Sequence, residues 1–204
     1  MKIIEIPTTG QEALVDITEQ AIDYVHTERL KDGILLIQMP DDTCGVTLMS
    51  DADAGYADDL FAKMNRFMPK YDGMRFTGWN TSRIKAALTG HTLELMVQGG
   101  ELILGLHQRI ALADFAAPSD GRRVYFAHVG TLLAEGEEPK LPEAVAELNR
   151  KDMEAEAAAK AEEERIIAEM RAEAAERARK YKEEQAAKEA ARKAEEAANG
   201  EKEE

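Results

Sequence analysis

The chain has 204 residues, of which 26 are Lys or Arg and 40 are Asp or Glu, so its formal net charge is -14. Nucleic acids and anionic membrane faces are bound through Lys and Arg contacts to phosphate, so this acidic balance argues against both partners. A single Cys excludes an intrachain disulfide and favours a cytoplasmic location. No apolar run approaches the roughly 20 residues that span a bilayer, and the first residues lack the pattern of a secretory signal.

The first 130 residues carry short runs rich in β-branched and aliphatic residues, separated by turn residues. The pair Gly99-Gly100 lies between two such runs, and two glycines supply the positive φ angles of a tight hairpin turn. Pro7 and Pro40 end the first two runs, because Pro cannot donate to a sheet ladder. We expect strands at 2–6, 33–39, 44–50, 92–97, 101–106, 108–115 and 122–130.

Three shorter segments have helical spacing of apolar residues. The first follows Thr18, a plausible N-cap, and runs to Leu30. The second spans 51–69 and is ended by Pro69, and the third lies at 82–88 and stops at Gly90. Strands with a few interspersed helices indicate an α+β fold whose antiparallel sheets each bury one face.

From Pro142 to Asn199 the pattern changes to one long helix. Ala and charged residues occupy 46 of the 54 positions of residues 151–204, so this segment has nothing with which to fill a core. Asn199-Gly200 is a stop signal, and we expect residues 200–204 to be disordered. Glu precedes Lys or Arg by four residues, the spacing that stabilises a helix, in Glu173-Arg177, Glu176-Lys180, Glu184-Lys188 and Glu189-Lys193.

The large apolar residues of this helix do not sustain the heptad of a classical coiled coil. One interpretation is a solvated single helix. The alternative is a helix that docks on a protein partner through Ile166, Ile167 and Met170.

Motifs for metal or cofactor binding are lacking. The four histidines have no metal-ligand spacing, and the acidic stretch 51–59 fails as a calcium loop because Ala62 stands where a bidentate Glu is required. There is no phosphate loop, dinucleotide fingerprint or nucleophile elbow. We therefore expect no metal and no cofactor, and Cys44 to be a small inert thiol in a buried strand.

Five collinear segments of the chain resemble the YjbQ family, also called the secondary thiamine-phosphate synthase family. The resemblance implies a compact α+β sandwich that assembles as a homotrimer. It also implies a side activity that joins a pyrimidine diphosphate to a thiazole phosphate. The segments are DITEQ (16–20), MPDDTCGVTLMSDAD (39–53), SRIKAALTGHTLELMV (82–97), GGELILGLHQRIALADF (99–115) and RRVYFAHVG (122–130).

The chain departs from the family in its catalytic motifs. The family's Pro-His-Thr-Thr-Ala-Gly run begins here at Pro40 and puts Asp41 at the histidine position, with Thr43 retained. In the family's Asn-Ala-x-Ala-His-Leu-Lys block, Arg83 takes the histidine position and Lys85 matches the lysine. A guanidinium has no lone pair, so Arg83 can neither ligate a metal nor act as a base.

Two interpretations of these substitutions stay open. In the first, Arg83 anchors a phosphate or carboxylate with its paired donors, Asp41 orients it and Lys85 assists. In the second, an Asp41–Arg83 salt bridge fills a pocket that has lost its chemistry. The catalytic candidates by family position are Asp41, Thr43 and Arg83, and the ligand-binding candidates are Arg83 and Lys85.

The expected organisation is a YjbQ-like domain over 1–135, a solvated or partner-binding helix over 142–199, and a disordered tail over 200–204. Two functions fit this organisation. The chain is either a thiamine-phosphate synthase-like transferase with a divergent or degenerate site, or a non-catalytic homotrimeric scaffold or anion-binding module that presents its C-terminal helices to a partner.

Overall fold

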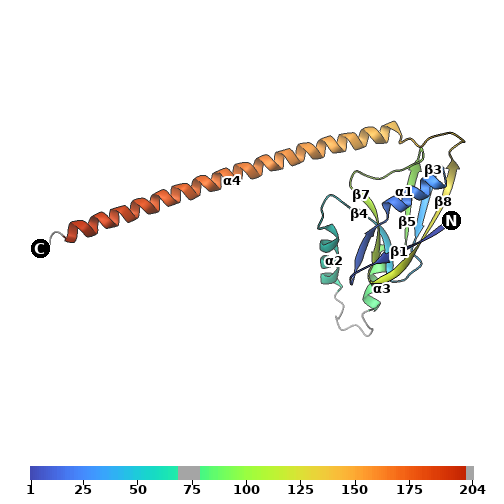
Figure 1. Ribbon diagram of the computed structural model, residues 1–204, viewed down its shortest axis with the longest axis horizontal. Helices are drawn as coiled ribbons and strands as arrows, with labels where there is room; N and C mark the ends of the chain where they lie inside the picture. The colour runs from blue at the N-terminus through green and yellow to red at the C-terminus, as the bar shows by residue number, and fades with distance from the viewer. Residues whose placement is uncertain (69–78, 201–204) are drawn as a thin grey trace. The chain divides into compact units, whose positions relative to one another are not determined.

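The computed structural model describes residues 1–68 and 79–200 (Figure 1). The chain divides into two compact units, Met1–Arg150 and Lys151–Glu204. The first unit is a mixed α+β domain with two antiparallel sheets, as predicted. The predicted domain ranges stay a proposal. The predicted helix end at Pro69 and the predicted disorder of 201–204 lie outside the described residues.

The larger sheet, sheet A, has five antiparallel strands. Its central strands alternate in burial, as a half-buried sheet requires: Leu95 and Val97 are buried, whereas Met96 between them is exposed. Gly99 and Gly100, with φ of 64° and 88°, form the predicted hairpin turn. The strand order is β1 (Lys2–Thr8), β8 (Ser119–Leu132), β3 (Leu30–Gln38), β5 (Thr92–Gln98) and β6 (Glu101–Leu102).

Sheet B has three strands, in the order β2 (Ala13–Asp16), β7 (Gln108–Asp114) and β4 (Cys44–Ser50). The two sheets pack over one apolar core, to which both contribute alternate side chains. From sheet B these include Val46, Ile110 and Leu112, and from sheet A they include Leu35 and Phe126. The domain is thus a sandwich in which each sheet turns one face inward.

Helix α1 (Thr18–Thr27) lies in this core, where Ala21, Tyr24 and Val25 are fully buried. Thr18 is not the N-cap that the sequence suggested. It is the first helical residue, and Asp16 Oδ1 accepts hydrogen bonds from its backbone N–H (2.8 Å) and its hydroxyl (2.6 Å). The Asp16 side chain, two residues upstream, therefore satisfies the backbone donor at the helix start.

Helices α2 (Tyr56–Phe67) and α3 (Trp79–Thr89) cover the other face of sheet B. A second, smaller apolar cluster forms there from Ala86 of α3 and Ala113 and Phe115 at the end of β7, with Phe61 and Met64 of α2 packed against it. Within residues 1–68 and 79–150, no helix gives such cover to the outer face of sheet A, where Ile34, Met96 and Val129 are exposed. The layering leaves that face open.

Several strands differ in extent from the prediction: β3 begins at Leu30, β8 runs from Ser119 to Leu132, and β2 was not predicted. β1 continues through Pro7 to Thr8, with a register shift between Ile6 and Thr8. An edge strand tolerates Pro7 because the side on which proline lacks an N–H faces no neighbouring strand. β6 has only two residues because the chain leaves the ladder beyond Ile103 and turns at Gly105, whose carbonyl accepts the Gln108 N–H (3.0 Å).

Helix α4 (Glu143–Gly200) is a single long helix. The predicted pairs Glu173–Arg177 (3.5 Å) and Glu176–Lys180 (2.7 Å) are present. The other two predicted pairs involve Glu184 and Glu189, whose side chains are outside the described part. Over the described ranges, no helix combines the length and the apolar character needed to cross a membrane.

Candidate functional site

The turn between β3 and β4 carries the first two candidate residues, Asp41 and Thr43. Asp41 Oδ1 accepts hydrogen bonds from the Thr43 backbone N–H (2.8 Å) and the Thr43 hydroxyl (2.7 Å). This is the local turn that Asp forms with the residue two positions on. Thr43 is buried, and its carbonyl accepts the Phe115 N–H at 3.1 Å. The turn therefore fastens the start of β4 to the end of β7.

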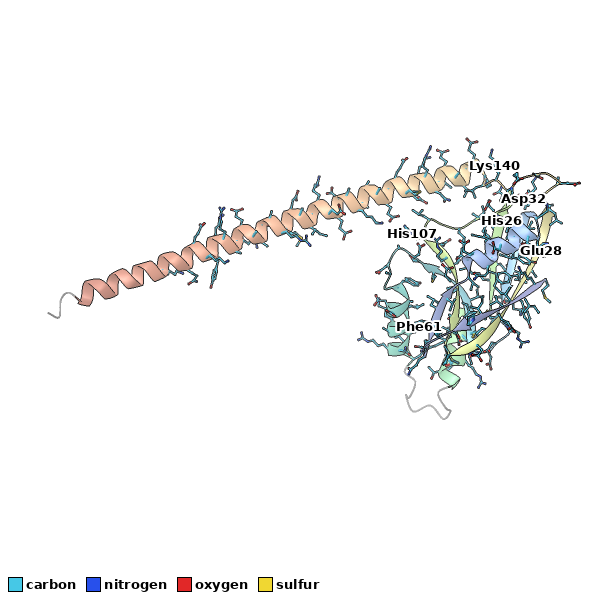
Figure 2. All side chains as sticks on the ribbon, in the orientation of Figure 1. His26, Glu28, Asp32, Phe61, His107 and Lys140 are labelled. Atoms are coloured by element: carbon cyan, nitrogen blue, oxygen red, sulfur yellow. The ribbon has the colours of Figure 1, made fainter. Side chains whose placement is uncertain are left out.

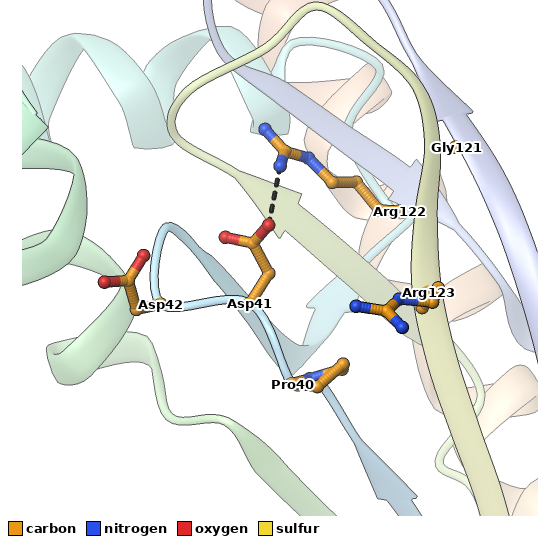
Figure 3. A pocket seen from close by; sticks show the side chains of 6 residues that line it. All are labelled: Pro40, Asp41, Asp42, Gly121, Arg122 and Arg123. Carbon is orange, nitrogen blue, oxygen red and sulfur yellow. Dashed lines mark hydrogen bonds and ion pairs between the residues drawn. The ribbon is translucent and has the colours of Figure 1, made fainter.

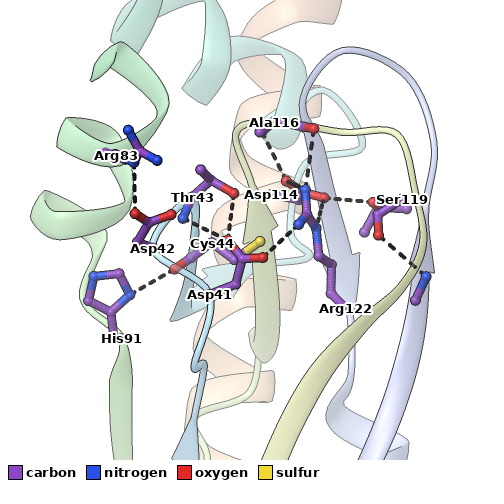
Figure 4. A network of polar contacts seen from close by, with 12 residues as sticks. Asp41, Asp42, Thr43, Cys44, Arg83, His91, Asp114, Ala116, Ser119 and Arg122 are labelled. Carbon is purple, nitrogen blue, oxygen red and sulfur yellow. Dashed lines mark hydrogen bonds and ion pairs between the residues drawn. The ribbon is translucent and has the colours of Figure 1, made fainter. Parts of the chain in front are cut away.

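Arg122, at the start of β8, joins this turn to sheet B (Figure 4). Its Nη1 donates to Asp41 Oδ2 at 2.7 Å. On the other side its Nε and Nη2 donate to the two carboxylate oxygens of Asp114, at 2.7 and 3.1 Å. Asp114 is fully buried and also accepts the Thr8 hydroxyl at 2.6 Å. We call Asp41, Arg122 and Asp114 the arginine clamp.

The clamp keeps both carboxylates ionised. Burial raises the pKa of Asp41, but hydrogen bonds from Thr43 and the charge of Arg122 outweigh it, so this pKa lies below its ordinary value. At Asp114, burial is likewise outweighed by hydrogen bonds from Arg122 and Thr8, and the pKa is lowered. Burial next to Asp114 raises the pKa of the Cys44 thiol to about 12, which fits the predicted inert thiol.

Arg83 lies near the clamp but is not paired with Asp41. Its Nε donates to Oδ2 of the neighbouring Asp42 at 2.7 Å, and both side chains are more than half exposed. The expected Asp41–Arg83 salt bridge is therefore replaced by two separate pairs. The reason is that the Asp41 carboxylate is already bound by Thr43 and Arg122.

Lys85, the other ligand-binding candidate, is buried on the opposite side of α3 from Arg83. Its Nζ donates to Glu12 Oε1 at 2.5 Å and to Asn65 Oδ1 at 2.6 Å. Asn65 in turn donates to Glu12 Oε2 at 2.6 Å. Only 3% of the Lys85 side chain is exposed, so this residue ties α3 to α2 and to the β1–β2 connection.

A cavity of about 530 Å³ opens beside the clamp (Figure 3). Two carboxylates and two guanidinium groups line it, so its charges balance, and the figure shows the Asp41–Arg122 pair spanning one side. The lining residues are Pro40, Asp41, Asp42, Gly121, Arg122 and Arg123. Among the residues that the structure describes, no group of three or more His, Cys, Asp or Glu side chains could hold a metal ion.

Sequence reasoning missed the central residues of this network, Arg122 and Asp114. Both lie in segments that carry the family resemblance, but their contact joins positions eight residues apart across a chain reversal, which no local period reveals. One feature of the sequence could have indicated the pair. Asp114 follows the apolar run of β7, and a carboxylate at a buried position needs a cationic partner.

The fold and the site together define an α+β sandwich whose polar cleft is closed by arginine–aspartate pairs. Residues 2–131 match the family described as UPF0047 protein YjbQ-like. The chain belongs to this family, and α4 lies beyond the matched residues.

Among its relatives, the UPF0047 protein MJ1081 of Methanocaldococcus jannaschii is 30% identical over 126 residues, which are 61% of this chain and 90% of that protein. The UPF0047 protein YugU of Bacillus subtilis is 28% identical over 120 residues, covering 58% of this chain and 91% of YugU.

Solved structures have the same fold. A protein of the YjbQ/UPF0047 family from Clostridium acetobutylicum, described as uncharacterized, has a TM-score of 0.61 at 25% identity, covering 63% of this chain and all of that one. A conserved hypothetical protein from Thermus thermophilus has a TM-score of 0.57 at 28% identity, again over 63% of this chain and all of its own.

Proposed function

We propose that this YjbQ-family chain is a non-catalytic homotrimeric scaffold that presents α4 to a protein partner. The observation that carries the proposal is the intramolecular pairing of the candidate residues. Asp41 is held by Arg122, Arg83 by Asp42, and Lys85 by Glu12 and Asn65. Asp41 and Lys85 are thus used to hold the fold, and the exposed Arg83 is the candidate that the assay below tests.

The chemistry of these groups supports the same conclusion. The lowered pKa of Asp41 makes its carboxylate a weak base and leaves it no proton to give near neutral pH. Arg83 stays protonated and has no lone pair. The Thr43 hydroxyl donates its hydrogen bond to a carboxylate within its own turn, so it is tied to the turn that it closes.

The open face of sheet A supports assembly of identical chains. Met96, Ile34 and Val129 lie side by side across β5, β3 and β8, and Ile3 lies farther along the same face. These four side chains, which we call the outer-face patch, are 47–78% exposed. Contiguous exposed apolar side chains of this kind mark interaction surfaces. The trimer implied by the family resemblance would cover them.

The composition of α4 supports the partner role. Ile166, Ile167 and Met170 lie within one turn of each other and are 41–65% exposed in an otherwise charged helix. A partner with an apolar groove rimmed by basic residues would match this segment. We expect the full chain to capture such a partner in a pull-down. The double variant Ile166→Glu, Ile167→Glu should fail to capture it.

The direct test of the scaffold proposal is an assay of thiamine-phosphate formation from the pyrimidine diphosphate and the thiazole phosphate. We expect the full chain to form no product above the uncatalysed background. Product formation that depends on Arg83, measured as its loss in Arg83→Ala, would overturn the proposal.

Anion binding is a second candidate, favoured by the guanidinium groups of Arg122 and Arg123 at the cavity. The carboxylates of Asp41 and Asp42 oppose it. Titration of inorganic phosphate and pyrophosphate into the wild type, Arg83→Ala and Arg123→Ala separates the two functions. Equal and negligible binding by all three ends the anchor hypothesis, whereas saturable binding that is lost in either variant would make the chain an anion-binding module.

A further inference from the structure

A second cavity lies away from the clamp, on the face of sheet B that α2 and α3 cover. Its volume is about 300 Å³. Its walls come from β4, α2, α3 and the end of β7, and they are uncharged, with Leu48, Leu60, Met64, Leu88 and Phe115 as the large apolar members. The cavity is open to solvent on one side, since Leu88 is 69% exposed.

The cavity lies beside the residues through which α2 packs against the rest of the domain. Phe61 and Met64 pack against the cluster of Ala86, Ala113 and Phe115. Phe61 stacks edge-on against Phe115 with ring centroids 6.1 Å apart, and Asn65 accepts a hydrogen bond from Lys85. Phe61 lies on the side of α2 turned toward the sheet (Figure 2).

The adjacent stripe of α2, Tyr56, Leu60 and Met64, follows the same four-residue spacing and lines the cavity. None of these residues is fully buried, since α2 has no buried residue. The buried polar contact of Lys85 with Glu12 and Asn65 holds the helix on the other side of this stripe.

One polar group of the cavity has no partner within the described residues, the hydroxyl of Tyr56. The hydroxyl of Thr89, another lining residue, instead donates to the Lys85 carbonyl at 2.9 Å. An apolar cavity with few polar groups is the usual form of a small-molecule site. Apolar cavities of roughly 150 Å³ hold one benzene ring, so a volume of about 300 Å³ has room for two fused rings.

We infer that this cavity binds a small, neutral, two-ring aromatic molecule that bears one hydroxyl or amino group. The rings contact Leu60, Met64 and Phe115, and the polar group bonds to the Tyr56 hydroxyl. The uncharged walls reject phosphates and carboxylates, so this site differs in chemistry from the cavity at Arg122. It does not depend on the scaffold proposal.

The test is calorimetric titration of the full chain with 2-naphthol and with naphthalene. We expect one site per chain with a Kd on the order of 0.1 mM for 2-naphthol. Leu60→Trp, which fills the cavity, should weaken binding of both probes at least about tenfold. Leu148→Trp, on an exposed position of α4, is the matched control and should bind as the wild type does.

Tyr56→Phe supplies a second, milder variant. It removes only the hydroxyl, so it should weaken 2-naphthol about two- to tenfold and leave naphthalene unchanged. Absence of saturable 2-naphthol binding to the wild type, or undiminished binding to a folded Leu60→Trp, would overturn the inference. Equal effects of Tyr56→Phe on the two probes would overturn the role of Tyr56. A fall in molecular mass of Leu60→Trp by light scattering would assign the cavity to a contact between copies instead.

Discussion

Arg122 is the side chain on which the polar network of the domain depends. It is the cation paired with Asp114, which is fully buried, and with Asp41 in the turn before β4. Removing one partner of a buried ion pair leaves a charge in a medium that solvates it poorly, and this costs more than the pair itself contributes.

Replacing Arg122 by Met should therefore lower the free energy of unfolding by about 3 kcal/mol or more at pH 7, measured by urea denaturation. The neighbouring exposed residue supplies the control, because Arg123→Met should change it by no more than about 0.5 kcal/mol. Equal effects of the two substitutions would mean that the clamp contributes little.

The clamp also predicts that the stabilities of the wild type and of Arg122→Met depend on pH in opposite directions. In the wild type the folded pKa values of Asp41 and Asp114 are lowered, so their contribution to stability is present above about pH 4 and is lost as the pH falls through the folded values. In Arg122→Met, burial of Asp114 acts unopposed and should raise its pKa. The free energy of unfolding of that variant should therefore rise as the pH falls from 7 to 5. A parallel decrease in both proteins, measured by urea denaturation, would contradict this.

Cys44 should be unreactive in the native protein. Its thiol is fully buried and has a pKa of about 12, whereas the reactive species is the thiolate. We expect reaction with a disulfide reagent at pH 7.5 to be at least about 100-fold slower in the native protein than in urea, where the thiol has its ordinary pKa. Rapid modification of the folded chain would show that the start of β4 opens.

Among the elements, β3 and β8 pair with no room for a side chain at Gly33. A Cβ added to Gly33 would lie 2.2 Å from the Val129 carbonyl oxygen, which is backbone and has little freedom to move. Gly33 pairs with Gly130 in the register, and the chain has a register shift between Leu30 and Asp32. The two strands approach there because neither residue has a side chain.

Gly33→Ala should therefore lower the free energy of unfolding by about 2 kcal/mol or more. Gly55→Ala is the matched control: the residue has an ordinary φ of -85° and a new Cβ would come no closer than 3.4 Å to its nearest neighbour. This control should be neutral or slightly stabilising. Thermal unfolding of both variants, followed by circular dichroism, is sufficient for the comparison.

At the scale of the whole molecule, the outer-face patch is the surface through which we propose that the chains assemble. The chain mass is 22.6 kDa, and a trimer would have about three times this value in light scattering. Ile34→Arg places a charge in the middle of the row formed with Met96 and Val129, so it should reduce the mass to that of one chain.

Leu88→Arg, at an apolar residue of α3 that is 69% exposed, serves as its control and should keep the assembled mass. If Leu88→Arg dissociates and Ile34→Arg does not, the interface lies at α3 instead of the outer-face patch. A wild type with the mass of one chain would end the proposal of a trimeric scaffold.

Much of the fold could be predicted from local pattern. Strand β4 at 44–50 coincides with its predicted range, and the hairpin at Gly99-Gly100 and the long charged helix are also confirmed. Each depends on a period or a residue type that acts within a few positions. The start of α1 was placed wrongly because Asp16 and Thr18 are both competent caps, and only their geometry distinguishes them.

The location of the candidate site could be predicted from the sequence, but the pairing of its side chains could not. The family resemblance indicated Asp41, Thr43 and Arg83, and the structure brings the turn at 41–43 and Arg83 to the same end of the sandwich through Asp42. Which acid pairs with which base depends on side chains from β8, β7 and α3 that approach only after the sheets have packed. That choice placed Arg122 with Asp41, and Lys85 with Glu12.

The sequence by itself determined the family, the α+β class and the charged helix beyond the domain, because motifs and hydrophobic periods are properties of neighbouring residues. Only the tertiary structure decided that Arg122 and Lys85 are paired with carboxylates of the chain, that four apolar side chains stay exposed on the outer face of sheet A, and that an uncharged cavity remains beside α2. These are outcomes of packing between segments far apart in the chain, such as Thr8 and Asp114, which are 106 residues apart, and no local pattern encodes them.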